Sequence, residues 1–290
     1  MSSTTPLVLA GGGSLGVVQV GMLQALVETG LSFDFVVGSS VGAINGAYFA
    51  ARPTLAGVAE LAEVWCGLRQ SDVFPFSLSD TLGSLLHQRG HLLQPVAFKR
   101  LIRRALPIRR IEEAQLPLHI IATDLLSGAE VAISAGDAEQ ALLASTAIPL
   151  VFPAVSRDGC FLVDGGVCSN TPIASAVALG ATRLLVLPTG FGCVCKEPPQ
   201  GLVALALHTL NLMSMRQLVR DTELYAARAA IHVVAPLCPL GVSVFDFGQT
   251  AELLQRAREQ TRLWLDVGGL EQSRVPDSLQ AHHHADMVMS

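Results

Sequence analysis

The first fifty residues alternate strands and helices around two tight, glycine-containing turns. The short apolar run Pro6–Ala10 predicts a buried strand, and GGGSLG follows it directly, before an apolar helix over Leu15–Glu28. Asp34–Gly38 predicts a second strand, which passes through a tight turn into a helix over Val41–Ala51. This alternation is typical of a mostly parallel sheet that is covered by helices on both faces. The sequence therefore predicts an α/β fold.

The rest of the chain continues this pattern without a Pro/Ser-rich linker, a charge block or an internal repeat, so one domain is expected. Further strands are expected over Leu118–Thr123, Glu130–Ser134, Arg183–Leu187 and Ile231–Ala235. Further helices are expected over Leu55–Leu68, Ala138–Thr146, Leu202–Met215 and Thr250–Asp266. Residues 282–290, which include three consecutive histidines, are expected to form a solvated, flexible tail.

The composition excludes several classes of protein. Half of the residues are hydrophobic (50%) and only 15% are charged, against about 25% in an average soluble protein. A chain this apolar can bury enough surface to offset its ordering entropy, which excludes disorder. The net charge of −5 argues against nucleic acid as a partner, because binding phosphates needs a basic field.

The apolar segments do not predict a membrane span or an export signal. Residues 1–27 carry no charge, but they lack the basic start of a signal peptide and are interrupted by the glycine loop. No uninterrupted apolar run reaches the roughly 20 residues that a bilayer span needs. The six cysteines form no CxxC pair, so free thiols and no metal site are expected. We therefore expect a cytoplasmic protein.

One segment, residues 95–110, is strongly basic. A helix through it would place Phe98, Leu101 and Ile102 on one face and most of its six basic residues on the other. We favour an ordinary surface helix with its apolar stripe in the core. The alternative is a helix that contacts an anionic membrane surface transiently.

Gly38–Gly42 reads Gly-Ser-Ser-Val-Gly and matches G-x-S-x-G between a predicted strand and a predicted helix. A serine on such a sharp turn projects its hydroxyl clear of the backbone, and the flanking glycines avoid collisions with neighbouring elements. The turn also brings the N–H of Val41 and the positive end of the helix beside a developing oxyanion. We predict Ser40 as a nucleophile, with a capping serine as the alternative; Ser39 is off-centre in the motif.

The loop Gly11-x-Gly13-x-x-Gly16 has two interpretations. It matches the dinucleotide-binding fingerprint, and Asp34 follows at about the right distance. However, Asp34 stands at the start of its strand, whereas the ribose-binding acid belongs at the carboxyl end. In the second interpretation, which we favour, the loop offers bare N–H groups as an oxyanion hole beside Ser40.

A serine hydroxyl needs a base. His208 lies inside a predicted apolar helix and His232 inside a predicted strand, so both are expected to be structural, although a histidine triad is an alternative. Asp164-Gly165-Gly166 follows the apolar stretch Cys160–Val163 and is better placed. A carboxylate there can accept the proton directly in a partly dry site, although such a triplet alone is more often only a turn.

Together, these segments resemble the patatin-like phospholipases. The signatures in question are GGGSLG at 11–16, GSSVG at 38–42 and DGGVCSNTPI at 164–173, with IATDLLSG at 121–128 and ASTAIPLVFP at 144–153 as further blocks. The resemblance implies a three-layer α/β/α fold with a catalytic core over residues 6–177. Residues 178–281 would complete the same domain and could supply a lipid-facing cover.

The resemblance also implies a function and a set of site residues. It implies hydrolysis of fatty-acyl esters of lipids or phospholipids by a Ser40–Asp164 dyad, without a metal or organic cofactor. The oxyanion hole would come from the glycine loop and the nucleophile turn, at Gly11, Gly12, Gly13 and Val41. The turns themselves would depend on Gly16, Gly38, Gly42, Gly165 and Gly166.

Leu15 departs from the family pattern, because many members carry Arg or Lys at this position. The backbone donors do not depend on that side chain, but any role of the cation beside the oxyanion or a charged headgroup is left open. Two alternatives from other classes are a nicotinamide- or flavin-dependent oxidoreductase and a catalytically weak lipid-binding protein of the same fold. Neither the lipid class nor the oligomeric state follows from the sequence.

Overall fold

A mixed eight-stranded sheet runs through the centre of the computed structural model, which describes residues 4–74, 91–190, 201–238, 240, 242–273, 275, 276 and 279. The strand order is β5-β6-β3-β2-β1-β7-β8, and β4 pairs with β3. The strands are β1 (Leu7–Leu9), β2 (Val36–Ser39), β3 (Leu118–Asp124), β4 (Glu130–Ile133), β5 (Val155–Arg157), β6 (Cys160–Asp164), β7 (Arg183–Leu187) and β8 (Ala230–Val233).

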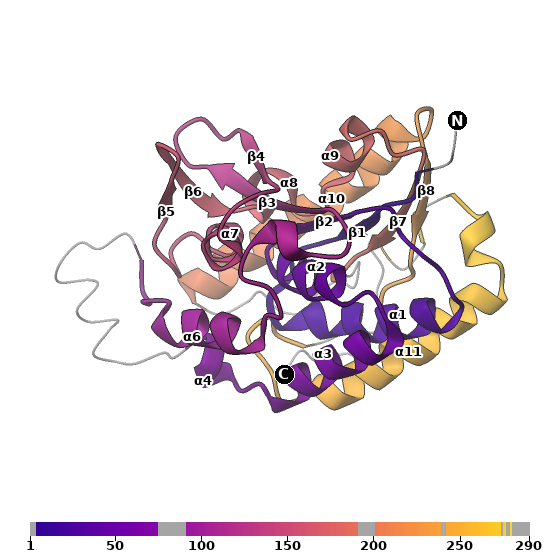
Figure 1. Ribbon diagram of the computed structural model, residues 1–290, viewed down its shortest axis with the longest axis horizontal. Coiled ribbons are helices and arrows are strands. Elements are labelled where there is room, and N and C mark those ends of the chain that lie inside the picture. Colours follow the sequence, from indigo (N-terminus) through magenta and orange to yellow (C-terminus); the bar gives the residue numbers. More distant parts are fainter. Residues whose placement is uncertain are drawn as a thin grey trace.

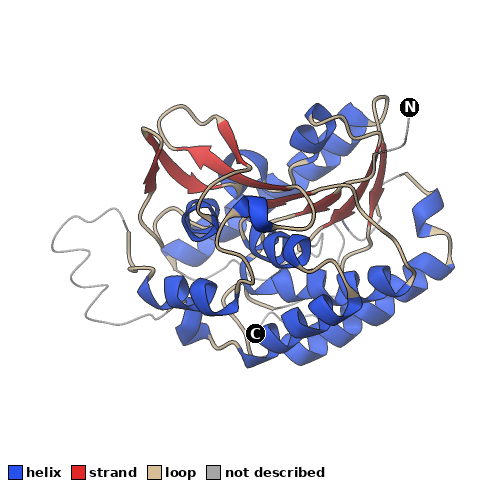
Figure 2. Ribbon diagram, viewed as in Figure 1, coloured by secondary structure: helices blue, strands red, loops and turns tan. Residues whose placement is uncertain are grey.

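Helices cover both faces of this sheet, as Figures 1 and 2 show. One layer contains α1 (Gly16–Glu28), α2 (Val41–Ala51), α3 (Leu55–Gly67), α7 (Ala138–Ser145) and α11 (Thr250–Asp266). The opposite layer contains α8 (Gly166–Ser169), α9 (Ile173–Ala178) and α10 (Leu202–Tyr225). The short helices α4 (Gln70–Val73) and α6 (Val96–Ala105) pack at one end, and single 3₁₀ turns occur at η1 (Gly13–Leu15), η2 (Ile111–Glu113) and η3 (Gly269–Glu271).

The core lies on both sides of the sheet because alternate strand residues point to opposite faces. Leu7 and Leu9 pack into the larger cluster beneath α1, α2 and α11, whereas Val8 packs with Val37 and Ile121 on the side of α9 and α10. All five side chains are fully buried or nearly so. This two-sided burial explains why the central strands are continuous apolar runs rather than alternating ones.

The sheet is parallel from β3 through β2, β1 and β7 to β8, and antiparallel where β4, β5 and β6 join. The prediction of a mostly parallel α/β sheet is thus confirmed, with an antiparallel edge that it did not include. Strand β5 was not predicted at all. It forms a hairpin with β6 through Asp158-Gly159, both at positive φ, a turn type that the Asp-Gly pair favours.

Two helices differ from their predicted extent. Helix α10 continues past the expected end at Met215 to Tyr225, because no Gly or Pro interrupts it. Helix α6 is shorter than the basic segment 95–110 and ends before Pro107, so Arg109 and Arg110 lie beyond it. The tail prediction for 282–290 falls outside the described residues. No helix in the described part of the chain combines the length and apolar content of a membrane span.

Candidate active site

Ser40 occupies the sharp turn between β2 and α2, as the motif predicts. Its backbone has φ 53° and ψ −127°, a conformation that is strained for a residue with a side chain. The turn is also crowded. A Cβ on Gly38 would lie 2.5 Å from the carbonyl oxygen of Gly42, and one on Gly42 would lie 2.3 Å from that of Leu9. The two flanking positions therefore require glycine.

Asp164 ends β6 and meets Ser40 across β3. The strand register places Ser39 opposite Ile121 and Asp164 opposite Ala122. The Ser40 hydroxyl donates to Asp164 Oδ2 at 2.6 Å, and the Gly166 N–H donates to Oδ1 at 2.7 Å. The arrangement is a buried hydroxyl–carboxylate pair.

Burial dominates the electrostatics of Asp164. It raises the pKa of this carboxyl from 3.8 to about 6, although the hydrogen bonds from Ser40 and Gly166 act in the opposite direction. A carboxylate with this pKa is still ionised at neutral pH and is a better proton acceptor than an exposed one. The pair therefore has the chemistry of a nucleophile and its base.

The glycine loop places free backbone amides beside this pair. The N–H groups of Gly12, Gly13 and Val41 make no hydrogen bond to any described residue, whereas Gly11 N–H donates to the Asn170 carbonyl at 3.0 Å. Gly13 has a positive φ of 59°, which suits glycine. Three of the four predicted oxyanion donors are thus available, and Gly11 instead ties the loop to the segment after α8.

Gly16 and Gly165 allow close packing around the loop and the base. A Cβ on Gly16 would lie 2.4 Å from Val41 Cγ2, and one on Gly165 would lie 2.3 Å from the carbonyl oxygen of Ile121. A Cβ on Gly166 would meet Asp164 Oδ1 at 3.0 Å. Side chains at these positions would force apart the elements that bring Ser40 and Asp164 together.

The residues that a dinucleotide-binding site or a histidine triad would require lie away from Ser40. Thr5 N–H donates to Asp34 Oδ2 at 2.6 Å, so Asp34 sits at the amino end of the parallel strands, opposite the glycine loop. His232 shares a 3.0 Å contact between its Nδ1 and the Gln272 carbonyl. Neither His232 nor His208 lines either of the pockets that contain Ser40. The Ser40 hydroxyl is paired with Asp164 rather than with a histidine.

An apolar pocket opens on one side of Ser40. Its empty space is about 810 Å³, solvent at the mouth included. Its walls come from α2, α3, α6, α7 and the loops beside them, and include Val41, Ile44, Leu61, Trp65, Phe98, Leu101, Ile102, Ala105, Leu142, Phe152 and Phe247. The pocket suits a hydrocarbon chain.

A second, more polar pocket opens on the other side, and Ser40 and Gly13 line both. Its empty space is about 660 Å³, measured in the same way. The walls combine the glycine loop and Asp164 with three uncharged polar side chains and several apolar ones, among them Asn170, Asn211, Ser214, Val244 and Phe245. The hydroxyl–carboxylate pair thus lies where the apolar pocket meets a pocket with more polar groups in its walls.

Helix α6 divides its side chains between pocket and solvent. Phe98 and Ile102 are buried against the apolar pocket, as the core interpretation of this segment predicts. The basic residues of the helix are exposed, and Lys99 and Arg103 form ion pairs with Glu139 on α7. The apolar stripe of the basic segment therefore forms a wall of the site.

A buried polar network beneath the glycine loop was not predicted. Gln19 donates to the carbonyls of Ala10 and Leu187 at 2.8 and 2.9 Å, and thereby holds the end of β1 against β7. Asn45 donates to Gln19 Oε1 at 2.9 Å and accepts from Trp65 Nε1 at 2.9 Å. The available signal was an amide side chain flanked by apolar residues in each of two largely apolar helices, α1 and α2.

Comparison with known proteins identifies the family. A model of the patatin-like phospholipases matches residues 7–177. The chain belongs to the patatin-like phospholipase family. The matched segment contains the Gly38–Gly42 turn, the Asp164–Gly166 turn and the Gly11–Gly16 loop.

Two longer relatives share part of their sequence with this patatin-like chain. The lysophospholipase nte1 of Aspergillus terreus is 29% identical over 195 residues, which are 67% of this chain and 12% of that protein. The patatin-like phospholipase domain-containing protein 7 of Rattus norvegicus is 31% identical over 186 residues, 63% of this chain and 13% of that protein. The chain thus spans only a small part of the length of these relatives.

The fold is also found among solved structures. Human GIVD cytosolic phospholipase A2, in complex with methyl gamma-linolenyl fluorophosphonate, superposes with a TM-score of 0.50 and 12% identity. The likeness covers 93% of this chain and 59% of that one. At this identity, the likeness shows the fold alone.

Proposed function

We propose that this patatin-like protein is a serine acyl hydrolase that cleaves fatty-acyl esters of lipids or phospholipids through a Ser40–Asp164 dyad. The observation that carries the proposal is the 2.6 Å hydrogen bond between the two side chains at the junction of the two pockets. Family membership and a lysophospholipase relative support a lipid ester as the substrate.

In the first half of the proposed reaction, Asp164 accepts the Ser40 proton as Oγ attacks the ester carbonyl carbon. The amides of Gly12, Gly13 and Val41 stabilise the oxyanion that forms. The tetrahedral intermediate then collapses and the bond to the alcohol oxygen breaks. The alcohol leaves with the proton from Asp164, and the acyl group remains on Ser40.

In the second half, Asp164 accepts a proton from water as the water oxygen attacks the acyl-enzyme. The same amides hold the second oxyanion, and Ser40 leaves with the proton returned by Asp164. The apolar pocket holds the acyl chain through both halves, whereas the polar pocket holds the alcohol and then admits water. Two pockets of different polarity on either side of Ser40 support this assignment.

Two further features of the chain enter the proposal. We infer that residues 178–281 complete the catalytic domain, because β7 pairs with β1 and β8 with β7. We also infer that the exposed face of α6 contacts anionic lipid surfaces transiently. Lys99, Arg100, Arg103 and Arg104 are all exposed on this helix, whose opposite face lines the apolar pocket.

Ser40→Ala tests the nucleophile. We expect ester hydrolysis to fall by about 10³-fold or more, and labelling by a fluorophosphonate probe to disappear, because no other group can form the acyl-enzyme. The measurements are release of fatty acid from a panel of phospholipids, lysophospholipids and glycerides, and gel detection of the probe.

Ser39→Ala is the matched control. The Ser39 hydroxyl is buried without a hydrogen-bond partner among the described residues, so its removal should leave turnover and labelling intact. Circular dichroism and the melting temperature establish that both variants fold. Near-normal turnover by pure, folded Ser40→Ala would refute the dyad, and an unlabelled, inactive wild-type protein would favour a lipid-binding role without catalysis.

A further inference from the structure

Ser145, the last residue of α7, contacts Ser40 and also Gly165, the residue that follows Asp164. Its hydroxyl accepts a hydrogen bond from the Ser40 N–H at 2.9 Å and donates one to the Ile121 carbonyl at 2.6 Å. Its own carbonyl accepts the Gly165 N–H at 3.2 Å, next to Asp164. We propose that Ser145 is a positioning residue. It holds the nucleophile turn (Gly38–Gly42) in a fixed position relative to the base turn (Asp164–Gly166). The inference rests on the proposed function of Ser40 and Asp164.

The conformation of Ser40 creates the need for such a contact. At φ 53° the residue has left the ladder of β2, and its N–H points toward the fully buried side chain of Ser145. A buried N–H without an acceptor is costly, so the strained turn is held only where an acceptor is supplied. The Ser145 hydroxyl supplies it, while the Ser40 carbonyl accepts the Ala43 N–H of α2 at 2.9 Å. Ser40 is therefore fixed on both sides of its Cα.

A hydroxyl is well suited to this position because it donates and accepts at the same time. Ile121 offers a carbonyl and Ser40 offers an N–H, and the Ser145 Oγ bridges the two. Alanine would leave both backbone groups unpaired in a site that is fully buried. The Ile121 carbonyl belongs to β3 and the Ser40 N–H to the nucleophile turn. Loss of the two hydrogen bonds would therefore release this turn from β3, the strand that pairs with the end of β6 at Asp164.

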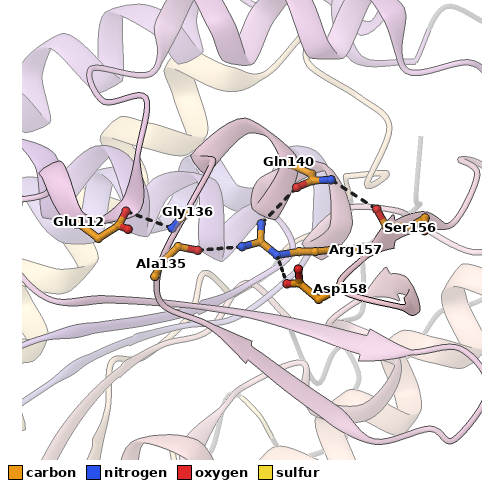
Figure 3. A network of polar contacts seen from close by, with 7 residues as sticks. All are labelled: Glu112, Ala135, Gly136, Gln140, Ser156, Arg157 and Asp158. Atoms are coloured by element: carbon orange, nitrogen blue, oxygen red, sulfur yellow. Dashed lines mark hydrogen bonds and ion pairs between the residues drawn. The ribbon is translucent and has the colours of Figure 1, made fainter.

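Helix α7 is itself anchored, so Ser145 has a fixed place from which to act. At its start, the Asp137 side chain accepts the Gln140 N–H at 2.7 Å. Arg157 of β5 donates to the Ala135 carbonyl at 2.8 Å, and Gln140 reaches the Ser156 carbonyl at 3.4 Å (Figure 3). Beyond its end, the Ala147 carbonyl accepts the Asp164 N–H at 3.0 Å. The helix thus joins the β5–β6 hairpin to both catalytic turns.

The test is Ser145→Ala, assayed with a soluble p-nitrophenyl acyl ester and with the rate of fluorophosphonate labelling. We expect kcat and the labelling rate to fall between about ten- and a hundredfold, as for a small displacement of a reacting group. The KM should stay within about twofold, because Ser145 lines neither pocket. A merely structural serine would lower the melting temperature and leave kcat unchanged at temperatures where the variant is folded.

Thr261→Val is the matched control. The Thr261 hydroxyl is equally buried and donates to the Ala257 carbonyl at 2.7 Å within α11, away from both pockets. Its removal should lower the melting temperature as Ser145→Ala does, with kcat and labelling as in the wild type. A loss of kcat in both variants to the same extent would show that stability alone is responsible, and would overturn the positioning role.

The outcomes separate this inference from the proposed function. If the wild-type protein neither labels nor hydrolyses esters, the proposed function fails first. If the wild type is active and Ser145→Ala labels at the wild-type rate, the positioning role fails and the dyad stands. Should Ser145→Ala not fold, Ser145→Cys keeps a weaker donor and acceptor; a reduced kcat with unchanged KM supports the role, and the wild-type kcat overturns it.

Discussion

The carboxyl of Asp164 is buried at a cost to the stability of the protein. Its pKa is about 6 in place of 3.8, which corresponds to about 3 kcal/mol between the two protonation states. An unfolded chain releases this proton near pH 4, whereas the folded chain holds it to about pH 6. Stability therefore falls as the pH rises through this window, and it stays lower above it. In the proposed reaction, this burial favours the role of Asp164 as a base, at the expense of the stability of the fold.

The substitution Asp164→Asn tests whether the buried carboxylate lowers the stability of the protein. The variant should be inactive, yet more stable than the wild type at about pH 8, by up to about 3 kcal/mol, because an amide need not ionise. The stability difference should shrink as the pH falls from about 6 to about 4, where the wild-type carboxyl becomes neutral. Urea denaturation at several pH values measures it. A variant that is less stable than the wild type at every pH would contradict the assignment.

The hydrogen-bonded pairing of Ser40 with Asp164 could be predicted from the sequence, whereas the contacts that support the pair could not. Ser40 and Asp164 stand in short motifs with glycines at fixed spacing, so local sequence indicates them. Ser145 is 105 residues from Ser40, and its contact depends on where α7 ends relative to β3. For Gly11 the motif gave the wrong expectation. The motif suggests that the Gly11 N–H is an oxyanion donor, but this N–H donates to the Asn170 carbonyl instead.

Helix α6 shows how one element serves two environments. Its sequence predicted an apolar stripe and a basic face, but could not show that the stripe would line a pocket rather than fill a core. That outcome depends on where α6 lies relative to α3, across the pocket, and to α7, against which it packs; both are separate elements of the chain. Similarly, the alternation of strands and helices predicted the parallel part of the sheet, whereas the antiparallel edge depends on the β5–β6 hairpin.

Ala105→Phe tests α6 as a wall of the acyl pocket. Ala105 faces the pocket near the end of the helix, so a ring there should fill space that a long chain needs. We expect kcat/KM for a palmitate ester to fall about tenfold and that for a butyrate ester to change less than about twofold. Arg104→Phe adds the same ring on the exposed face and should change neither. Equal losses for both esters would contradict the assignment of this pocket to the acyl chain.

The whole molecule carries a net charge of −5, yet its charge is unevenly distributed. Four cations line the exposed face of α6, and Glu139 pairs with two of them, Lys99 and Arg103. Arg100 and Arg104 form no ion pair with any described residue, so their charges remain available to a partner. Because the same helix walls the apolar pocket, an anionic surface attracted to it would lie beside the route for acyl chains.

The double variant R100E/R104E tests whether this face brings the enzyme to lipid. Each cation near an anionic surface contributes about 1 kcal/mol, so two reversals should weaken binding to phosphatidylserine vesicles by at least about tenfold. Hydrolysis of vesicle lipid should fall in parallel, while turnover of a soluble butyrate ester stays unchanged, since neither arginine lines a pocket.

A matched reversal elsewhere separates local attraction from overall charge. Arg216 and Arg228 are both exposed and lie outside α6, so R216E/R228E changes the net charge equally. Vesicle binding of this control should stay close to that of the wild type, and added salt should weaken the wild type more than R100E/R104E. If both double variants lose binding equally, net charge rather than the α6 face controls adsorption. If neither double variant loses vesicle binding, then lipid reaches the apolar pocket without an electrostatic contact at α6.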